Sequence, residues 1–285
     1  MLRILSFNIL APIFASPQWY PENINKKYLK EDHRLPKILN FINTQKDKID
    51  IFCFQEVTCK EFIKIEELLS ENFVGDMAYN DKDYWNTSIV KPLKYKPHGN
   101  AIFVNKNKFT NIKFQIKDLK TGNKCIGVLC KKSNKYIRTH SVHFDSDNVK
   151  NRELELITLL ESIKNDNILD VIDVIAGDIN SDTQSTDIGK IFKKYKFINA
   201  LKKSKHTPYT SYTPYTLHTH PWDPRDDNPS MNAMIDHIMI HNSKSFKSKI
   251  FSFDIMKYKS ELKRINKTLR LLGSDHFPIK AHVIT

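Results

Sequence analysis

The chain has 285 residues, of which 40% are hydrophobic and 27% are charged, as in an ordinary globular protein with a substantial buried core. No apolar run is long enough to cross a membrane as a helix, so we expect no membrane association. The 45 Lys and Arg residues exceed the 32 Asp and Glu residues, which gives a net charge of +13. This excess favours a polyanionic partner, because Lys and Arg contacts to phosphates release counterions. A Lys-rich surface inherited from an AT-rich genome is the alternative.

The first part of the chain predicts alternating strands and helices. "RILSFNIL" begins with Arg3 before an apolar run, as weak signal peptides do, but Asn8 in this run and the alternation that follows favour a core strand. "RLPKILNFINT", at 34–44, has helical apolar spacing, and "CKEFIKIEELLSEN" is an amphipathic helix. Between them, "IDIFCFQEV" is almost continuously apolar, which predicts a strand buried on both faces.

The remaining elements extend the same alternation. Successive strands are predicted at "NAIFVNK", "FTNIKFQIKDL", "KCIGVLCKK" and "KYIRTHSVHF", with a turn at "KTGN". A helix at "NRELELITLLESIKN" leads to a strand at "DVIDVIAGDIN", and a polar helix-and-loop region follows. The proline-rich and aromatic segment "YTSYTPYTLHTHPWDPRDDNPS" predicts a long loop before two closing strands, "MIDHIMIHN" and "HFPIKAHVI". No repeat or linker divides the chain, so we expect one domain, 1–285, built as a two-sheet α/β sandwich.

The cysteines indicate a reducing compartment. They show no CxxC spacing, and most of them lie in apolar runs that predict buried strands, so we expect neither a zinc site nor a disulfide framework. The four residues are Cys53, Cys59, Cys125 and Cys130. We therefore expect a protein of the cytoplasm or nucleus that is not secreted.

Several predicted strands end in polar residues that apolar packing does not favour. The ends of strands and the loops after them are where sites assemble in α/β folds. The set contains carboxylates, amides and imidazoles without a thiolate, and such hard ligands suit Mg²⁺ or Mn²⁺ better than Zn²⁺. A hard cation, an imidazole and further carboxylates are the groups that phosphodiester hydrolysis requires. The residues are Asn8, Glu56, His143, Asp178, Asn180, Asp236, Asp275 and His276.

Five short motifs carry a resemblance to a known superfamily. In order along the chain they are "SFNIL", "FQEV", "GDIN", "IDHI" and "SDHFPI". Together they resemble the endonuclease/exonuclease/phosphatase superfamily, which includes deoxyribonuclease I, the abasic-site endonucleases and the deadenylases. The resemblance implies a four-layer α/β sandwich, in which helices flank two mixed, mostly antiparallel sheets. It also implies a Mg²⁺-dependent site, with Mn²⁺ as a possible substitute, and phosphodiesterase or phosphatase chemistry.

Within that superfamily the chain looks most like the deadenylase branch, with its Angel- and nocturnin-like relatives. "NILAP", followed at a distance by "HRLPKILNFI", is similar to the opening of that branch. "GNAIFVNKNKFT" is similar to its middle pair of strands, and "YTSYT" to the region before its penultimate strand. The abasic-site branch fits less well, because Asn232, Ala233 and Met234 stand where its members usually carry a Trp and an Arg.

The resemblance also assigns metal and water roles. It implies that Glu56 is the principal metal ligand, that Asn8 lies beside it, and that Asp275 helps to hold the metal. Asp178 would activate or position the attacking water.

Three more residues correspond to groups that act on the phosphate. Asn180 would contact the scissile phosphate, and His276 would contact it in the transition state. Asp236 would orient the His276 imidazole, as a carboxylate fixes a tautomer.

The superfamily also has a His at the end of a central strand, and "RTHSVHFDSDNVKNR" offers two candidates. His140 and His143 are three residues apart and so point to opposite faces of a strand. We favour His143, because Phe144 and Asp145 follow it and Arg152 opens the next helix, as in the family pattern. Arg152 is then a candidate substrate-binding residue.

Two segments look like insertions that border the site and so bear on substrate choice. The first is "LHTHPWDPRDDNPS"; its Trp222, together with Tyr209, Tyr212 and Tyr215 just before it, could stack on bases, or this aromatic loop could pack against itself. The second contains a basic run from Lys244 to Arg270, which either contacts a phosphate backbone or forms a solvated helix face.

The leading functional hypothesis is a Mg²⁺-dependent phosphodiesterase that acts on nucleic acid, with RNA favoured over DNA. A monomeric 3′–5′ exoribonuclease of the deadenylase kind fits best. Three alternatives stay open: a DNA-repair nuclease or DNA-end phosphodiesterase, a phosphatase of nucleotides or RNA termini, and a non-catalytic nucleic-acid-binding protein. Protein partners are unknown from the sequence.

Overall fold

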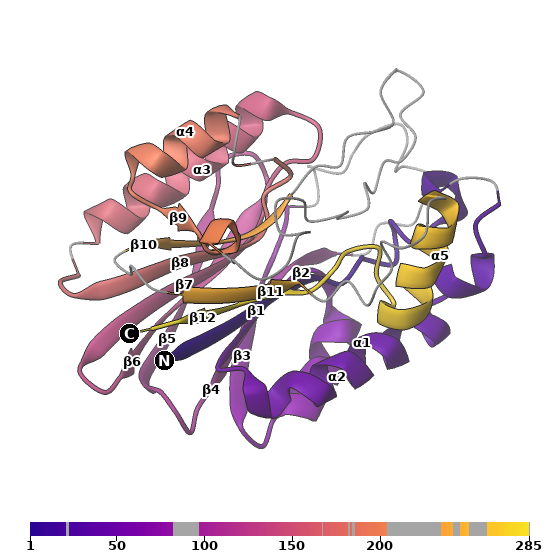
Figure 1. Cartoon of the computed structure of the whole chain (residues 1–285), viewed down its shortest axis with the longest axis horizontal. Helices are drawn as coiled ribbons and strands as arrows, with labels where there is room; N and C mark the ends of the chain where they lie inside the picture. Colours follow the sequence, from indigo (N-terminus) through magenta and orange to yellow (C-terminus); the bar gives the residue numbers. More distant parts are fainter. Residues whose placement is uncertain are drawn as a thin grey trace.

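Two β-sheets packed face to face form the centre of the molecule, with helices on their outer sides (Figure 1). The computed structural model describes residues 1–20, 23–81, 97–166, 168–181, 183, 186–203, 235–241, 246–250 and 261–284. Each sheet has six strands, and in each sheet one neighbouring pair is parallel and the others are antiparallel. The predicted four-layer α/β sandwich of two mixed, mostly antiparallel sheets is therefore confirmed.

The first sheet, sheet A, has the strand order β11-β12-β1-β2-β4-β3. Its strands β1 and β2 run parallel. Their bounds are β1 Leu2–Asn8, β2 Ile51–Thr58, β3 Phe73–Tyr79, β4 His98–Asn105, β11 Phe246–Ile250 and β12 Ile279–Val283. Strand β1 thus lies between β2 and β12 and joins the two ends of the described chain in one sheet.

The second sheet, sheet B, has the order β5-β6-β7-β8-β10-β9, and its parallel pair is β7 and β8. Its strands are β5 Thr110–Asp118, β6 Lys124–Lys132, β7 Lys135–His143, β8 Val171–Asp178, β9 Ile198–Asn199 and β10 Asp236–His241. Because β10 is antiparallel to β8, it begins where β8 ends, with Asp236 opposite Asp178. The end of β8 and the start of β10 therefore lie side by side at the same end of sheet B.

Five α-helices lie among the described residues: α1 Glu31–Gln45, α2 Cys59–Leu69, α3 Val149–Asn165, α4 Asp187–Lys194 and α5 Glu261–Leu272. Helices α1 and α2 pack on sheet A, α3 and α4 pack on sheet B, and α5 packs beside α1 (Figure 1). Short 3₁₀ helices lie at Pro17–Trp19, Lys26–Leu29, Lys46–Lys48 and Ala200–Lys203. None of the described helices has the length and apolarity that a membrane crossing needs.

Three apolar layers hold the sandwich together. The layer between the sheets takes one face of each strand, for example Ile4, Cys53 and Val174. The alternate residues of the same strands, such as Phe7 and Phe54, pack under the outer helices. This alternation follows from the period of two residues in a strand, and it explains why β2 is buried along its whole length and apolar from Ile51 to Phe54.

The structure adds elements that the sequence patterns do not predict. In strand β3, Gly75 and Asp76 interrupt the apolar pattern, so the sequence signal for a strand is weak. The polar region after β8, predicted as helix and loop, holds α4 and in addition the short strand β9, and the basic run from Lys244 to Arg270 holds β11 and most of α5. The predicted aromatic loop lies outside the described residues, as do its Tyr209, Tyr212, Tyr215 and Trp222 and the neighbouring Asn232, Ala233 and Met234.

Candidate active site

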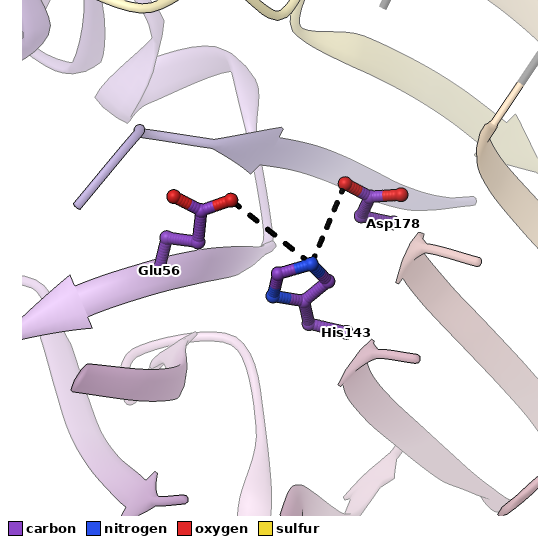
Figure 2. A group of neighbouring side chains, drawn as sticks. All are labelled: Glu56, His143 and Asp178. Carbon is purple, nitrogen blue, oxygen red and sulfur yellow. Dashed lines mark ion pairs between the residues drawn. The ribbon is translucent and has the colours of Figure 1, made fainter. Parts of the chain in front are cut away.

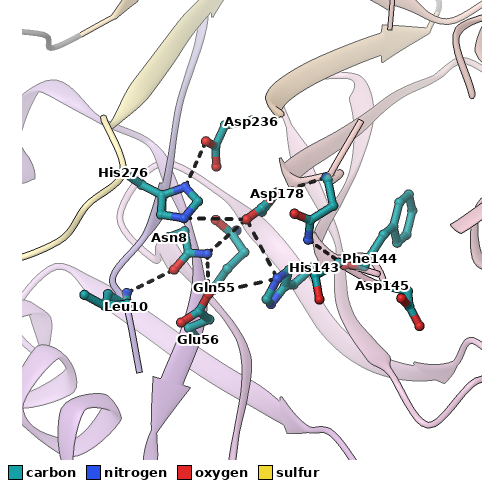
Figure 3. Close-up of polar contacts among 12 residues, drawn as sticks. Asn8, Leu10, Gln55, Glu56, His143, Phe144, Asp145, Asp178, Asp236 and His276 are labelled. Atoms are coloured by element: carbon teal, nitrogen blue, oxygen red, sulfur yellow. Dashed lines mark hydrogen bonds and ion pairs between the residues drawn. The ribbon is translucent and has the colours of Figure 1, made fainter. Parts of the chain in front are cut away.

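The ends of five strands bring polar side chains from both sheets together (Figure 3). Strands β1 and β2 of sheet A and β7 and β8 of sheet B all end at this edge, whereas β10 begins there. The turn before β12 adds two more residues. The side chains that meet are Asn8, Glu56, His143, Asp178, Asp236, Asp275 and His276, and each is at least 92% buried. We call these seven residues the polar cluster.

Asn8 links the two sheets at the centre of the polar cluster. Its Nδ2 donates to Glu56 Oε1 at 2.7 Å and to Asp178 Oδ2 at 3.1 Å. Its Oδ1 accepts from the Leu10 backbone N–H at 3.0 Å, which fixes the orientation of the amide. One amide therefore holds two carboxylates from different sheets at a fixed separation.

A β-bulge directs Glu56 towards this centre. The register between β2 and β4 shifts between Phe54 and Val57, so that one extra residue is accommodated on β2. Glu56 has a left-handed backbone with φ of 58°. In a regular strand Gln55 and Glu56 would point to opposite faces, but here Gln55 Nε2 donates to Ser141 Oγ of sheet B while Glu56 also faces sheet B. The bulge is the local feature that makes Glu56 part of the polar cluster.

The Glu56 carboxylate is ionised despite its burial. Its Oε2 accepts from the Ala11 backbone N–H at 2.8 Å. Burial alone would raise the pKa of Glu56, but the charges of His143 and His276 and the hydrogen bond from Asn8 together hold this pKa below its ordinary value.

His143 lies between two of the carboxylates (Figure 2). Its Nε2 is 4.0 Å from Glu56 Oε1 and 3.7 Å from Asp178 Oδ2. His140 lies on the opposite face of β7, where its ring packs against Gly127 on the side of the sheet that faces the outer helices. Burial and the nearby cations Arg138 and Lys117 lower the pKa of His140 to about 3, so it is neutral. Of the two histidines, the structure places His143 in the polar cluster.

Asp178 and Asn180 form a local turn at the end of β8. The backbone N–H of Asn180 donates to Asp178 Oδ1 at 3.0 Å, and Asn180 Nδ2 donates to the Phe144 carbonyl at 2.8 Å. Gly177 permits the close approach of β7, since a Cβ on it would lie 1.9 Å from the Val142 carbonyl oxygen. Asn180 is partly exposed and lies beside the polar cluster, with its amide nitrogen held by the loop after β7.

His276 is held by Asp236 across a buried contact. His276 Nδ1 lies 3.1 Å from Asp236 Oδ2, and both side chains are almost completely buried. Burial favours the neutral imidazole, but Asp236, followed by Asp178 and Asp275, raises the pKa of His276 to about 10. His276 Nε2 has no hydrogen-bond partner and lies 3.8 Å from Asp178 Oδ2. A charged imidazole therefore directs an unshared N–H towards the other carboxylates.

Asp275 offers a second unshared atom. Its Oδ2 accepts from the Tyr20 hydroxyl at 2.8 Å, whereas its Oδ1 is buried without a hydrogen-bond partner, 3.9 Å from His276 Nε2. Burial raises the pKa of Asp275 to about 6. The turn itself is fixed by Ser274 Oγ, which donates to the Asn8 carbonyl at 2.7 Å and accepts from the His276 backbone N–H at 3.1 Å.

The donor atoms of the polar cluster fit a hard divalent cation. Glu56, His143 and Asp178 each place one ligand atom within 4.8 Å of the others, and Asp178, Asp236 and His276 form a second such group. Four buried carboxylates face two imidazoles, and the orphaned Asp275 Oδ1 needs a cation or a donor. Oxygen donors without a thiolate suit Mg²⁺ or Mn²⁺.

Of the three residues predicted to bind substrate, the structure describes Arg152. Arg152 Nη1 donates to the backbone carbonyls of Asp145 and Ser146 at 2.9 and 3.0 Å and so braces the loop after β7. Its contact with a substrate stays a prediction. Tyr212 and Trp222 lie outside the described residues.

Sequence patterns missed the residues that support the polar cluster. Tyr20 holds Asp275, Ser274 joins the first and last loops, and Gln55 bridges the sheets through Ser141. Arg34, in α1, donates to backbone carbonyls of both loops. Its signal was present in the sequence, because Arg34 occupies the apolar stripe of a predicted helix.

Comparisons with known proteins show the fold. No protein-family model matches the chain, and no curated protein matches it. An endonuclease/exonuclease/phosphatase structure from Bacteroides vulgatus matches with a TM-score of 0.68 and 17% identity, covering 99% of this chain and 98% of that one. The human nocturnin catalytic domain with bound sulfate matches with a TM-score of 0.65 and 18% identity, over 99% and 94% of the two chains.

A third structure is ANGEL2, a 2′,3′-cyclic phosphatase in complex with adenosine-2′,3′-vanadate. It matches with a TM-score of 0.66 and 16% identity, covering 98% of this chain and 94% of that one. These matches extend over nearly the whole of each chain, so the agreement concerns the complete architecture rather than one sheet. The chain has the fold of the endonuclease/exonuclease/phosphatase superfamily that its sequence motifs resemble.

Proposed function

We propose that the chain is a divalent-metal-dependent hydrolase of phosphate esters. The observation that carries the proposal is the meeting of four buried carboxylates and two imidazoles from both sheets, with Asp275 Oδ1 and His276 Nε2 left unpartnered. An excess of buried negative charge beside a charged imidazole suits a bound cation and an anionic substrate.

Glu56 and Asp275 are the proposed metal ligands, with Asn8 orienting Glu56 through a 2.7 Å hydrogen bond. When bound, Mg²⁺ or Mn²⁺ would supply positive charge that polarises a phosphate oxygen. Tyr20 supports the role of Asp275, because the Tyr20 hydroxyl donates to Asp275 Oδ2 and leaves Asp275 Oδ1 available to the metal ion.

Asp178 is the proposed group that positions the attacking water. Its Oδ1 is held by the Asn180 N–H and its Oδ2 by Asn8, so the carboxylate has a defined orientation. A carboxylate fixed in this way accepts a proton from water in a defined direction, which is what in-line attack on phosphorus requires.

His276 is the proposed donor to the phosphate oxygens that gain charge during attack. Asp236 binds Nδ1, so the proton on Nε2 faces the polar cluster. A preorganised donor of this kind contributes about 10²- to 10³-fold in rate. The Asn180 side chain, at the edge of the polar cluster, is the proposed second contact to the phosphate.

The proposed substrate is nucleic acid, with the 3′ end of RNA favoured. The net charge of +13 supports a polyanion, and the motifs that resemble the deadenylase branch favour RNA. The test is initial-rate hydrolysis of labelled poly(A), mixed-sequence RNA and duplex abasic DNA, with Mg²⁺, with Mn²⁺ and with chelator. Glu56→Gln is the control for contaminating nuclease. Retained RNA affinity without turnover of any phosphate ester would overturn the proposal and favour a binding protein.

A phosphatase of RNA termini or nucleotides is the second candidate. It is favoured by the similarity to ANGEL2, whose structure is that of a 2′,3′-cyclic phosphatase. Oligonucleotides that end in a 2′,3′-cyclic phosphate or a 3′-phosphate distinguish the two functions. Release of inorganic phosphate, or ring opening without shortening of the strand, identifies the second one.

A further inference from the structure

Arg34 is a fully buried cation that hydrogen-bonds to backbone carbonyls only. Its side chain is 1% exposed and lies on the apolar stripe of α1 with Ile38, Phe41 and Ile42. Nε donates to the Gly273 carbonyl at 2.7 Å, and Nη2 donates to the Ile9 carbonyl at 2.8 Å and to the Leu10 carbonyl. A buried guanidinium is costly, so its contacts indicate a specific role.

The carbonyls that Arg34 binds belong to two loops, one that directly follows Asn8 and one that carries Asp275 and His276. Leu10 follows Asn8 and donates its N–H to Asn8 Oδ1, and the next N–H, that of Ala11, binds Glu56. Gly273 begins the turn that presents Asp275 and His276. Arg34 therefore joins, from α1, the loop after β1 to the loop before β12.

The backbone of both loops requires support. Leu10 has a left-handed φ of 62°, which is unfavourable for a Leu, and Gly273 has a φ of 74°. A Cβ on Gly273 would lie 2.4 Å from the Arg34 carbonyl oxygen, so α1 and this turn are already in close contact. The fork of the guanidinium reaches three carbonyls in fixed directions, whereas a Lys ammonium is a single point charge.

We propose that Arg34 is a positioning residue, which sets the separation between Asn8 at the end of β1 and Asp275 and His276 on the loop before β12. The inference rests on the proposed function, since it concerns the same site. It goes beyond the proposed function because it gives helix α1 control over the geometry of the polar cluster, although α1 contributes no residue to that cluster.

The test compares Arg34→Lys with Arg138→Lys. Arg138→Lys is the control. Arg138 is also a buried arginine, 5% exposed, but it donates to Asp173, Asp166 and the Ile163 carbonyl, away from the polar cluster. The measurements are Mn²⁺ affinity by electron paramagnetic resonance without substrate, kcat and KM with the preferred substrate, and the melting temperature.

We expect Arg34→Lys to lower Mn²⁺ affinity and kcat by about 10- to 100-fold, the range for residues that orient metal ligands, with little change in KM. We expect Arg138→Lys to lower the melting temperature about as much as Arg34→Lys does, but to leave Mn²⁺ affinity and kcat within twofold of the wild type. Equal values for the two variants at matched folded fraction would overturn the inference. If the wild type binds Mn²⁺ but turns over no substrate, the proposed function fails while the Mn²⁺ comparison still tests Arg34.

Gly273→Ala provides a second route if Arg34→Lys does not fold. The added methyl group pushes the last loop away from the Arg34 carbonyl without touching the guanidinium. We expect faster amide hydrogen exchange in peptides covering 8–13 and 273–278, together with the same loss of Mn²⁺ affinity. Wild-type Mn²⁺ affinity in this variant, despite faster exchange, would refute the positioning role.

Discussion

Asp236→Asn tests the part of the site that acts on the phosphate without touching the proposed metal ligands. Asp236 Oδ2 lies 3.1 Å from His276 Nδ1 in a fully buried contact. An Asn of the same shape removes the negative charge, and its amide can present either an oxygen or an N–H to the imidazole. The variant therefore loses both the charge that keeps His276 protonated and the preference for a proton on Nδ1.

The size of the effect follows from the contact. At an effective dielectric constant of about 20, opposite charges about 4 Å apart attract by about 4 kcal/mol, which corresponds to about 3 pKa units. Burial already opposes the charged imidazole, and Asp236 is the largest of the groups that raise the pKa of His276 to about 10. Losing it lowers the pKa of His276 to near neutrality. With a wrong tautomer in part of the molecules, we expect kcat to fall about 10²- to 10⁴-fold.

The assay is the pH dependence of kcat at saturating Mg²⁺ from about pH 6 to about pH 10. We expect the alkaline loss of activity to move to lower pH in Asp236→Asn, with Mn²⁺ affinity unchanged. Asp173→Asn is the matched control, because Asp173 is also a buried carboxylate that contacts a histidine, His241, at 3.4 Å. A kcat within threefold of the wild type would refute the role of Asp236, and a collapse of Mn²⁺ affinity would show that Asp236 is a metal ligand.

Three further predictions use other parts of the structure. Glu56→Gln should lower kcat by at least about 10²-fold with an unchanged circular dichroism spectrum; turnover close to the wild type would mean that the metal site is misassigned. Burial opposes ionisation of Asp50, but Arg3, Lys108 and Lys132 lower its pKa from 3.8 to about 2. A lowered pKa stabilises the folded state at pH values above the unfolded-state pKa. The free energy of unfolding should therefore fall by about 1 to 2 kcal/mol as the pH drops from about 4 to about 2, a figure that allows for the partly exposed cations. Urea unfolding of the wild type and Asp50→Asn over this range checks it, and a constant difference would contradict it. Gly177→Ala should destabilise the fold by about 1 to 3 kcal/mol or more through contact with the Val142 carbonyl, and an unchanged melting temperature would contradict this.

The architecture was predictable where residue patterns carry it. The nearly continuous apolar run of β2 is a direct consequence of burial on two faces, and five motifs at or beside strand ends indicated the superfamily. Strand β3 was not predictable, since Gly75 and Asp76 interrupt its apolar pattern and its pairing with β4 depends on tertiary contacts.

The residue types of the candidate site were predictable, but their geometry was not. Simple alternation would place Glu56 on the face opposite Gln55, and only the bulge, which no local pattern indicates, turns it towards sheet B. The partners of Asp275 and of the loops, Tyr20 and Arg34, come from distant parts of the chain. The buried position of Arg34 shows in the sequence as a cation on an apolar stripe, but the partners that Arg34 and Tyr20 contact do not.

The position of β1 between β2 and β12 has a consequence for biosynthesis. The hydrogen bond between Ser274 and Asn8 spans 266 residues, and β1 pairs with β12 along five residue pairs. During translation β2 can join β1 early, but the other edge of β1 remains open until Val283 has left the ribosome. The nascent chain therefore carries Glu56, Asp178 and Asp236 well before Asp275 and His276 are made, so the polar cluster is completed only by the last segment of the fold.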